Sequence, residues 1–341
     1  MLRALGRGGG TPGSAKSASC SSLRIGAWIG YRSAVIPYVR RTLLAGIAVT
    51  LGVSVLAFSL LHLLPGDPVL VMLGDAGHPP ERIEELRAEL GLEAPVAVQY
   101  ARYLGNLLHG DLGRSIRSNR PVLDEIRQQA PNTLALTFAA LGLAVLVGIP
   151  LGALAAYRRG GWVDRAGVTL ALLGVSFPSF WLGMLLIFAF ALSLGWLPAT
   201  GQGGPERLIL PAFTLAVQGM AVIALATRAK TREVLGQQYV RTARAIGTPE
   251  LRVLLRNALK NVMVPVVTIV GLQFAAFLSG SVIIENVFAR QGMGRLVVEA
   301  ILNRDVPVVQ GVVIVASVAY VLVNLAVDLT CAALDPRIRY E

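Results

Sequence analysis

The sequence predicts an all-α membrane protein with six spans. Of its 341 residues, 54% are hydrophobic and 15% are charged, whereas a soluble domain carries about a quarter charged residues. The mean hydropathy is +0.63. Six apolar runs are each long enough to cross about 30 Å of hydrocarbon. The runs cover residues 42–64, 134–157, 168–194, 208–227, 264–284 and 308–334.

The third and fourth runs are the ones in which we expect the helix to be disturbed. In the third run, Phe177-Pro178-Ser179 predicts a kink, because proline removes a backbone hydrogen bond and clashes with the preceding turn. The fourth run is the weakest span, since Pro211 and Gln218 interrupt it. Proline and glycine within spans are tolerated when neighbouring helices satisfy the backbone, so the pattern favours a bundle.

The distribution of charge predicts the orientation. With a cytoplasmic N-terminus, 20 of the 31 Lys and Arg residues fall on the cytoplasmic side. The short loops decide the orientation: residues 158–165 and 228–262 carry 3 and 8 basic residues, against 1 and 3 in residues 195–207 and 285–307. We therefore expect a multi-pass protein of the cell membrane with both termini cytoplasmic. The net charge of +11 then reflects topology and predicts no nucleic-acid partner.

The chain divides into four parts. Residues 1–36, rich in Gly, Ser and Arg, are expected to form a disordered cytoplasmic tail. Residues 37–64 form the first span, and residues 65–130 form a large external loop that either caps the bundle or contacts a partner as well. Residues 131–341 form the transmembrane core, which carries a cytoplasmic segment at 228–263.

The cytoplasmic segment contains a predicted corner between two helices. Gly247 can end one helix in the left-handed conformation, and Thr248 can cap the next. Pro249 suits the first turn of that second helix, where Glu250 complements the helix dipole. A short helix pair with a tight corner between membrane spans indicates a docking element.

The second helix of this pair is predicted to be amphipathic. Arg252, Arg256 and Lys260 recur four residues apart and form a basic stripe. The apolar positions recur at helical spacing: Leu251, Leu254, Leu255, Ala258, Leu259 and Val262. An alternative use of the basic stripe is to lie on anionic lipid.

Motifs for catalysis are absent from the sequence. No Gly-Lys pair occurs, so no phosphate-binding P-loop exists, and no HExxH, CxxC or GxSxG motif is found. We expect no enzyme activity, cofactor or metal in this chain. Asp328 is the clear charge within a span, and it is either a structural anchor or a functional group.

The cytoplasmic segment resembles the signature loop of ABC-importer permeases. Residues 239–247, continuing to Val264-Pro265-Val266, are most similar to the first permease subunit of dipeptide and oligopeptide uptake systems. Five further patches resemble the same subunit, and together they extend over residues 37–339. These patches are Leu64-Pro65-Gly66-Asp67-Pro68; Leu90-Gly91-Leu92 with Pro95, Gln99 and Tyr100; Gly110-Asp111-Leu112-Gly113; residues 285–296; and Asp335-Pro336-Arg337.

The match to the general form of the loop is partial. Ala243, Gly247 and Leu259 fit it, whereas the usual Glu and first Ala are replaced by Arg241 and Thr242. The resemblance implies a six-span type I ABC-importer permease fold and a segment that docks in a cleft of an ATP-binding subunit. The implied coupling residues are Arg241, Thr242, Ala243, Arg244, Gly247, Thr248, Pro249, Glu250, Leu251 and Leu259.

The resemblance also implies partners and further sites. The partners are a second homologous permease, two ATP-binding subunits that hold ATP and Mg²⁺, an extracytoplasmic peptide-binding protein and the lipid bilayer. Gln218, Gln273 and Asn324 are candidates to line the pathway, or else to hydrogen-bond between spans. The external elbow, where cargo would arrive, comprises Glu285, Asn286, Phe288, Gly292, Gly294 and Arg295.

The function implied by the resemblance is ATP-driven import of di- and oligopeptides. The same class importing nickel, glutathione or another small solute remains an alternative. Alternatives from other classes are an ion-coupled secondary carrier, which Asp328 would serve, and a membrane scaffold or intramembrane enzyme.

Overall fold

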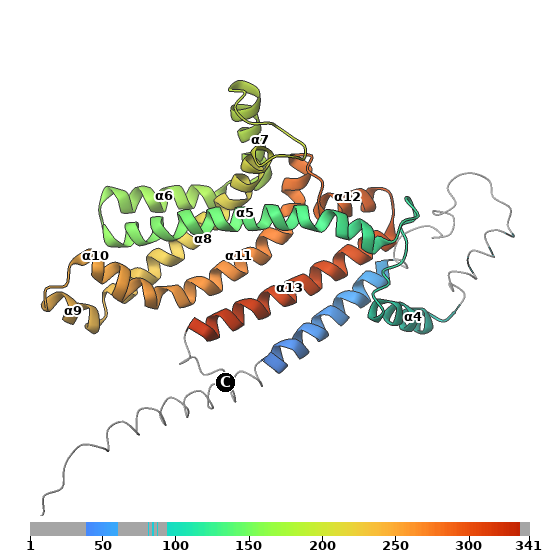
Figure 1. Ribbon diagram of the computed structural model, residues 1–341, viewed down its shortest axis with the longest axis horizontal. Coiled ribbons are helices and arrows are strands. Elements are labelled where there is room, and N and C mark those ends of the chain that lie inside the picture. The colour runs from blue at the N-terminus through green and yellow to red at the C-terminus, as the bar shows by residue number, and fades with distance from the viewer. Residues whose placement is uncertain (1–38, 61–80, 82–83, 85–86, 88–93, 335–341) are drawn as a thin grey trace, which may run out of the picture.

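The computed structural model describes residues 39–60, 81, 84, 87 and 94–334, and within these residues the protein is helical without a named strand (Figure 1). The predicted tail and much of the first half of the external loop lie outside the described residues. After the first span helix (Val39–Leu60), the elements are α4 (Val96–Leu108), α5 (Val122–Tyr157), α6 (Trp162–Ser176), α7 (Ser179–Leu186), η1 (Ile187–Ser193), α8 (Glu206–Leu235), α9 (Gln238–Ala245), α10 (Glu250–Arg252), η2 (Val253–Ala258), α11 (Leu259–Val287), α12 (Met293–Leu302) and α13 (Val306–Leu334).

Five helices of the described part are long and apolar enough to cross a membrane: the first span helix, α5, α8, α11 and α13. They coincide with five of the six predicted runs. The sixth run corresponds to a bent pair, α6 followed by α7 and η1, and the number of spans is six if this pair counts as one. The all-α membrane class is therefore confirmed.

The third predicted span is broken rather than kinked. The bend lies at the predicted Phe177-Pro178 step, but its angle is 102°, so the two halves do not form one rod. Pro178 has no backbone N–H to continue the helical hydrogen bonds of α6. At the same break, the carbonyl of Phe177 accepts a hydrogen bond from Gln218 Nε2 at 3.2 Å. As a result, α7 and η1 turn away from the direction of α6 (Figure 1), and α7 packs against α8 and α11.

The fourth span, expected to be the weakest, is the most buried. Half of the apolar stretch of α8 is buried inside the subunit, against a third or less for the other spans. Pro211 lies near the beginning of α8 and does not interrupt it. Two glycines of α5 allow close approach: a Cβ on Gly148 would lie 2.9 Å from the Met220 carbonyl oxygen, and one on Gly152 would lie 2.8 Å from Thr227 Cβ.

The second span helix begins earlier than predicted. Residues 122–130, assigned above to the external loop, form the first turns of α5. Val122 and Ile126 are buried there against Val308 and Val312 of α13. This packing places the start of α5 inside the protein core, which explains why helix continues through Pro131.

The first span helix lies at the edge of the bundle beside α13. A Cβ on Gly46 would overlap Val321 of α13, so the two helices pack closely. Gln310 Nε2 donates to the Ala57 carbonyl oxygen at 3.0 Å, and Ser54 shares a hydrogen bond with Tyr100 of α4 at 2.8 Å. These contacts attach the N-terminal helix and α4 to the core.

The close contact between α5 and α8 generates a prediction. Gly152→Leu should lower the thermal unfolding temperature of the purified protein, because overpacking costs about 1–3 kcal/mol. The matched control is Gly142→Leu, on the same helix, where an added Cβ meets nothing within 4 Å. Equal unfolding temperatures for the two variants would contradict the proposed role of Gly152.

Candidate functional site

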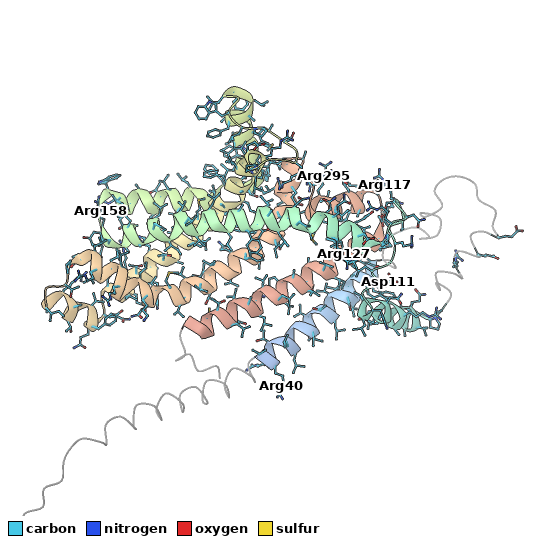
Figure 2. All side chains as sticks on the ribbon, in the orientation of Figure 1. Arg40, Asp111, Arg117, Arg127, Arg158 and Arg295 are labelled. Atoms are coloured by element: carbon cyan, nitrogen blue, oxygen red, sulfur yellow. The ribbon has the colours of Figure 1, made fainter. Side chains whose placement is uncertain are left out.

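The predicted functional residues gather at two opposite ends of the bundle. The helices α9 and α10 form one end, and α12 lies at the other (Figure 1). The labelled side chains follow this division, with Arg158 at the α9 end and Arg117 and Arg295 at the α12 end (Figure 2). Each end is described in turn.

The corner at the α9 end is built around Gly247. Its φ is +79°, so the left-handed conformation predicted for it is confirmed. Its N–H donates to the Arg244 carbonyl oxygen at 2.9 Å, and the Thr248 N–H donates to the Ala243 carbonyl oxygen at 3.1 Å. This pair of bonds is a Schellman motif, which satisfies the last carbonyls of α9.

The start of the next helix differs from the prediction. Thr248 does not cap it, because the N-cap position is occupied by Pro249 and no side chain provides a capping hydrogen bond. Pro249 thus lies one position before the first turn that we assigned to it. Glu250 does lie in the first turn, and its carboxylate accepts two hydrogen bonds from Arg244, at 2.8 and 3.2 Å, which close the corner.

A small apolar cluster supports the corner from beneath. Val240 and Ala243 of α9 are buried against Val253 of η2. Asn261 Nδ2 of α11 donates to the hydroxyl of Tyr239 in α9 at 2.7 Å, which is a second contact across the corner. The two helices of the corner are therefore held together by an apolar cluster and by hydrogen bonds.

The apolar stripe predicted for the second helix is wrong in its register. Residues 253–258 form a π-helical stretch, which holds more residues per turn than an α-helix and rotates the following side chains. Leu254, Ala258 and Val262 are buried, but Leu251 and Leu255 are exposed. Leu251 is 65% exposed and the neighbouring Ile246 is 77% exposed, so the corner presents an apolar surface.

The remaining residues of the predicted coupling set have mixed burial. Ala243 is buried, and Thr248 and Leu259 are partly buried. The basic residues Arg252, Arg256 and Lys260 are exposed. The exposed members of the coupling set are Arg241, Thr242, Arg244, Gly247, Pro249, Glu250 and Leu251.

Sequence reasoning missed a buried carboxylate at this end of the bundle. Asp164 of α6 accepts a hydrogen bond from Arg228 Nε at 2.6 Å and is also bound by Arg232 Nη2. The Gly160 N–H donates to the same carboxylate at 3.1 Å. Asp164 thus joins the loop before α6 to the end of α8 that leads into α9. The sequence feature that could have indicated this site is an acidic residue within the short basic loop at 158–165.

At the α12 end, the predicted elbow contains a fully buried carboxylate. Glu285, in the last turn of α11, accepts a hydrogen bond from Thr133 Oγ1 of α5 at 2.6 Å. It also accepts from the N–H groups of Gly294 and Arg295 at 2.8 and 3.1 Å. The Met293 N–H donates to Thr133 Oγ1 at 2.8 Å, so α5, α11 and α12 meet at one polar site.

The glycines of the elbow are needed for space around this carboxylate. A Cβ on Gly292 would overlap the Glu285 carboxylate, and one on Gly294 would overlap the backbone of Val282. Phe288 is buried as well, whereas Asn286 is exposed and Arg295 pairs with Glu299 at 2.7 Å. Burial lowers the pKa of Arg290, and the nearby Glu285 carboxylate opposes that shift.

A second carboxylate at the α12 end was also missed by sequence reasoning. Asp305, just before α13, is buried and accepts from Ser115 Oγ at 2.5 Å. The N–H groups of Ile116 and Arg117 donate to it at 3.1 and 3.4 Å. It therefore fixes the end of the external loop to the start of α13. Its 190-residue separation from Ser115 left no local pattern to find it.

The three candidate pathway residues lie on different helices. Gln218 of α8 donates to the backbone at the α6 break, which is a structural role. Gln273 of α11 and Asn324 of α13 are partly buried. No hydrogen bond joins these three side chains to one another. Among the described residues, no group of three or more His, Cys, Asp or Glu side chains could hold a metal ion.

Comparison with known protein families matches most of the chain. Residues 148–340 match the family described as binding-protein-dependent transport system inner membrane component. Residues 35–137 match the N-terminal unit of the same kind of transport-system membrane component. The chain belongs to this family. It is thus a permease of the ABC-importer class, a transport component rather than a catalytic subunit, and the resemblance noted in the sequence is confirmed.

Curated relatives of this permease match over most of their length. A putative peptide transport system permease protein of Brucella abortus (strain 2308) is 44% identical over 303 residues, which cover 86% of this chain and 96% of the relative. The glutathione transport system permease protein of Escherichia coli (strain K12) is 44% identical over 307 residues, covering 90% of this chain and all of the relative.

A solved structure supports the fold of the permease. A chain of the inward-facing MetNI methionine ABC transporter superposes with a TM-score of 0.55 and 18% identity. The match covers 62% of this chain and 97% of that chain. This similarity concerns the fold alone.

The Glu285 site generates a prediction about the stability of the permease. Glu285→Ala should lower the thermal unfolding temperature, because it removes a buried acceptor from three donors. Each lost hydrogen bond to a charged group costs about 1.5–3 kcal/mol. The matched control is Asn286→Ala, whose exposed side chain bonds within its own helix turn. Equal unfolding temperatures for the two variants would show that the carboxylate is not a structural tie.

Proposed function

We propose that this permease forms half of the translocation pathway of an ATP-driven importer of peptides and couples to cytoplasmic ATPase subunits through its corner at residues 241–251. The observation that carries the proposal is the corner itself. It combines a glycine in the left-handed conformation, an apolar cluster that joins its two helices, and the exposed apolar side chains of Ile246 and Leu251. Exposed apolar side chains at the end of a polar, basic segment are suited to a protein partner.

The corner is mechanically connected to the bundle. It joins the end of α8 to the start of α11, and both of these helices contact α5. Because Arg244 and Glu250 close the corner, a partner that moves it would move these helices together. ATP binding to the partner would then favour one of two arrangements of the pathway, which is a population shift driven by differential binding.

The proposed orientation follows from charge. The α9 end carries the basic loops at 158–165 and 228–262, so we place it in the cytoplasm, together with the N-terminus. ATP and Mg²⁺ would be held by the two ATP-binding subunits at that end. The α12 end, with the elbow at Glu285–Arg295, would then face outward and receive the peptide-binding protein. Gln273 and Asn324 remain candidates to line the pathway.

A second permease is the proposed partner of the arm formed by α7 and η1. The arm covers residues 179–193, about 22 Å of helix, which is shorter than the roughly 30 Å hydrocarbon layer. Its large side chains are apolar on every side, and Gly183 is its one buried residue among those described. The exposed side chains are Phe180, Trp181, Met184, Leu185, Phe188 and Leu192. A homologous subunit with its own arm would bury this surface reciprocally.

The proposed cargo rests on the names of relatives. The Brucella abortus relative is named a putative peptide transport permease and the Escherichia coli relative a glutathione transport permease. Since glutathione is itself a tripeptide, the two names describe one chemical class. We therefore propose peptides as the cargo and keep glutathione as the alternative.

Uptake measurements test the proposed coupling. Gly247→Val should reduce uptake of a labelled tripeptide and the cargo-stimulated ATPase activity by tenfold or more in the assembled complex, because Val is strained at positive φ. Unlabelled glutathione added as a competitor distinguishes the two cargoes.

The matched control for this test is Gly110→Val. Gly110 has nearly the same φ of +78° and the same open surroundings. Its neighbour Asp111 lies at the opposite end of the molecule from Arg158 (Figure 2). Normal uptake by Gly247→Val would reject the corner as the coupling element, and equal losses in both variants would show that strain alone explains the effect.

Co-purification tests the proposed role of the arm. Phe188→Ala combined with Leu192→Ala should lower the amount of second permease recovered with the tagged chain by about tenfold, which corresponds to about 1.4 kcal/mol. The control pair is Leu44→Ala with Leu56→Ala, equally exposed apolar residues of the first span helix. If both pairs of substitutions leave recovery unchanged, the arm does not hold the second subunit.

A further inference from the structure

An apolar cavity lies between α5, α6 and α8, away from the corner and the elbow. Its volume is about 350 Å³, within the range of roughly 300–1,000 Å³ typical of small-molecule sites. Figure 1 shows these three helices running side by side, and they contact one another. The lining includes Leu151, Gly167, Gly174 and Phe213, and its single charged residue is Arg228.

Two glycines on α6 line the cavity. A Cβ on Gly174 would lie 3.3 Å from Val217 Cγ1, so α6 and α8 are in contact at that level. A Cβ on Gly167 would lie 3.6 Å from Ala155 Cβ, which is ordinary contact distance, so α6 also lies close to α5 at that level. The cavity is thus bounded by glycines where α6 lies close to α5 and α8.

The cavity has the length of a lipid chain. Phe213 and Arg228 line it at positions 15 residues apart on α8, about 22 Å along a helix. Half of the hydrocarbon layer is about 15 Å thick. The cavity can therefore accommodate an extended acyl chain from the membrane interface to beyond the centre of the bilayer.

The end of the cavity at Arg228 is positively charged. Arg228 and Arg232 share the one carboxylate of Asp164, so two cations face one anion. Arg232 Nε is buried and has no hydrogen-bond partner among the described residues. The adjoining loop adds the exposed residues Arg158 and Arg159.

Trp162, which is 78% exposed, begins α6 at the same end of the cavity. Tryptophan with arginine at the end of a span is typical of the interface between hydrocarbon and lipid headgroups. The arginine end of the cavity is thus placed at the level where lipid phosphates lie.

We propose that this cavity binds one acyl chain of an anionic phospholipid from the leaflet at the α9 end. The phosphate lies against the arginines around Asp164, and the chain fills the space beside Gly167. Basic pockets between spans bind anionic headgroups in this way. The lipid would pack α6 against α5 and α8 and so support the part of α8 that leads to the corner.

Native mass spectrometry of the complete transporter in detergent tests the proposal. The permease should retain phosphatidylglycerol about tenfold more tightly than phosphatidylcholine. Gly167→Leu, which fills the cavity, should reduce retained phosphatidylglycerol about tenfold, whereas Gly52→Leu, on an open face of the first span helix, should not.

A second variant keeps the test independent of folding. Arg158→Gln with Arg159→Gln should abolish most of the preference for phosphatidylglycerol while chain binding persists. Equal retention of both lipids by the unmodified complex would overturn the proposal. The proposal would also be overturned if Leu170→Cys, at the rim of the cavity, formed an efficient cross-link to the second permease in a complex that retains no lipid.

Discussion

Close approach of backbones is the constraint on which this structure depends. In a bilayer, helices gain little by hiding apolar side chains, since the lipid is equally apolar, so packing at short range must hold them together. Gly148 and Gly152 provide this packing between α5 and α8. The position of α8 then determines where α9 and the corner lie, because α8 continues into them after a short turn.

Buried carboxylates complement the apolar bundle at its two ends. Asp164 binds two arginines, Glu285 accepts from Thr133 and two N–H groups, and Asp305 accepts from the loop at Ser115. Each carboxylate joins segments that are far apart in sequence. A buried charge is costly unless its hydrogen bonds are satisfied. The loops that donate these hydrogen bonds are therefore held in one geometry.

The features that could be predicted from the sequence were local ones. The straight spans follow from apolar length, and the conformation of Gly247 follows from the residues around it. The bend at Pro178 was placed correctly, but its angle depends on where the chain packs next. The exposure of Leu255 was missed because it lies in a π-helical stretch, which has no clear sequence pattern. The contact of Glu285 with Thr133 and that of Asp305 with Ser115 were missed because each joins residues more than 150 positions apart.

Helix α5 has a consequence for how this permease is made. The N-terminal family match ends at residue 137 and the C-terminal match begins at residue 148, yet both positions lie inside the unbroken helix Val122–Tyr157. The boundary between the matches is therefore not a joint in the molecule. A ribosome must synthesise residues from both regions before this span is complete, and the two regions enter the bilayer as parts of one rod.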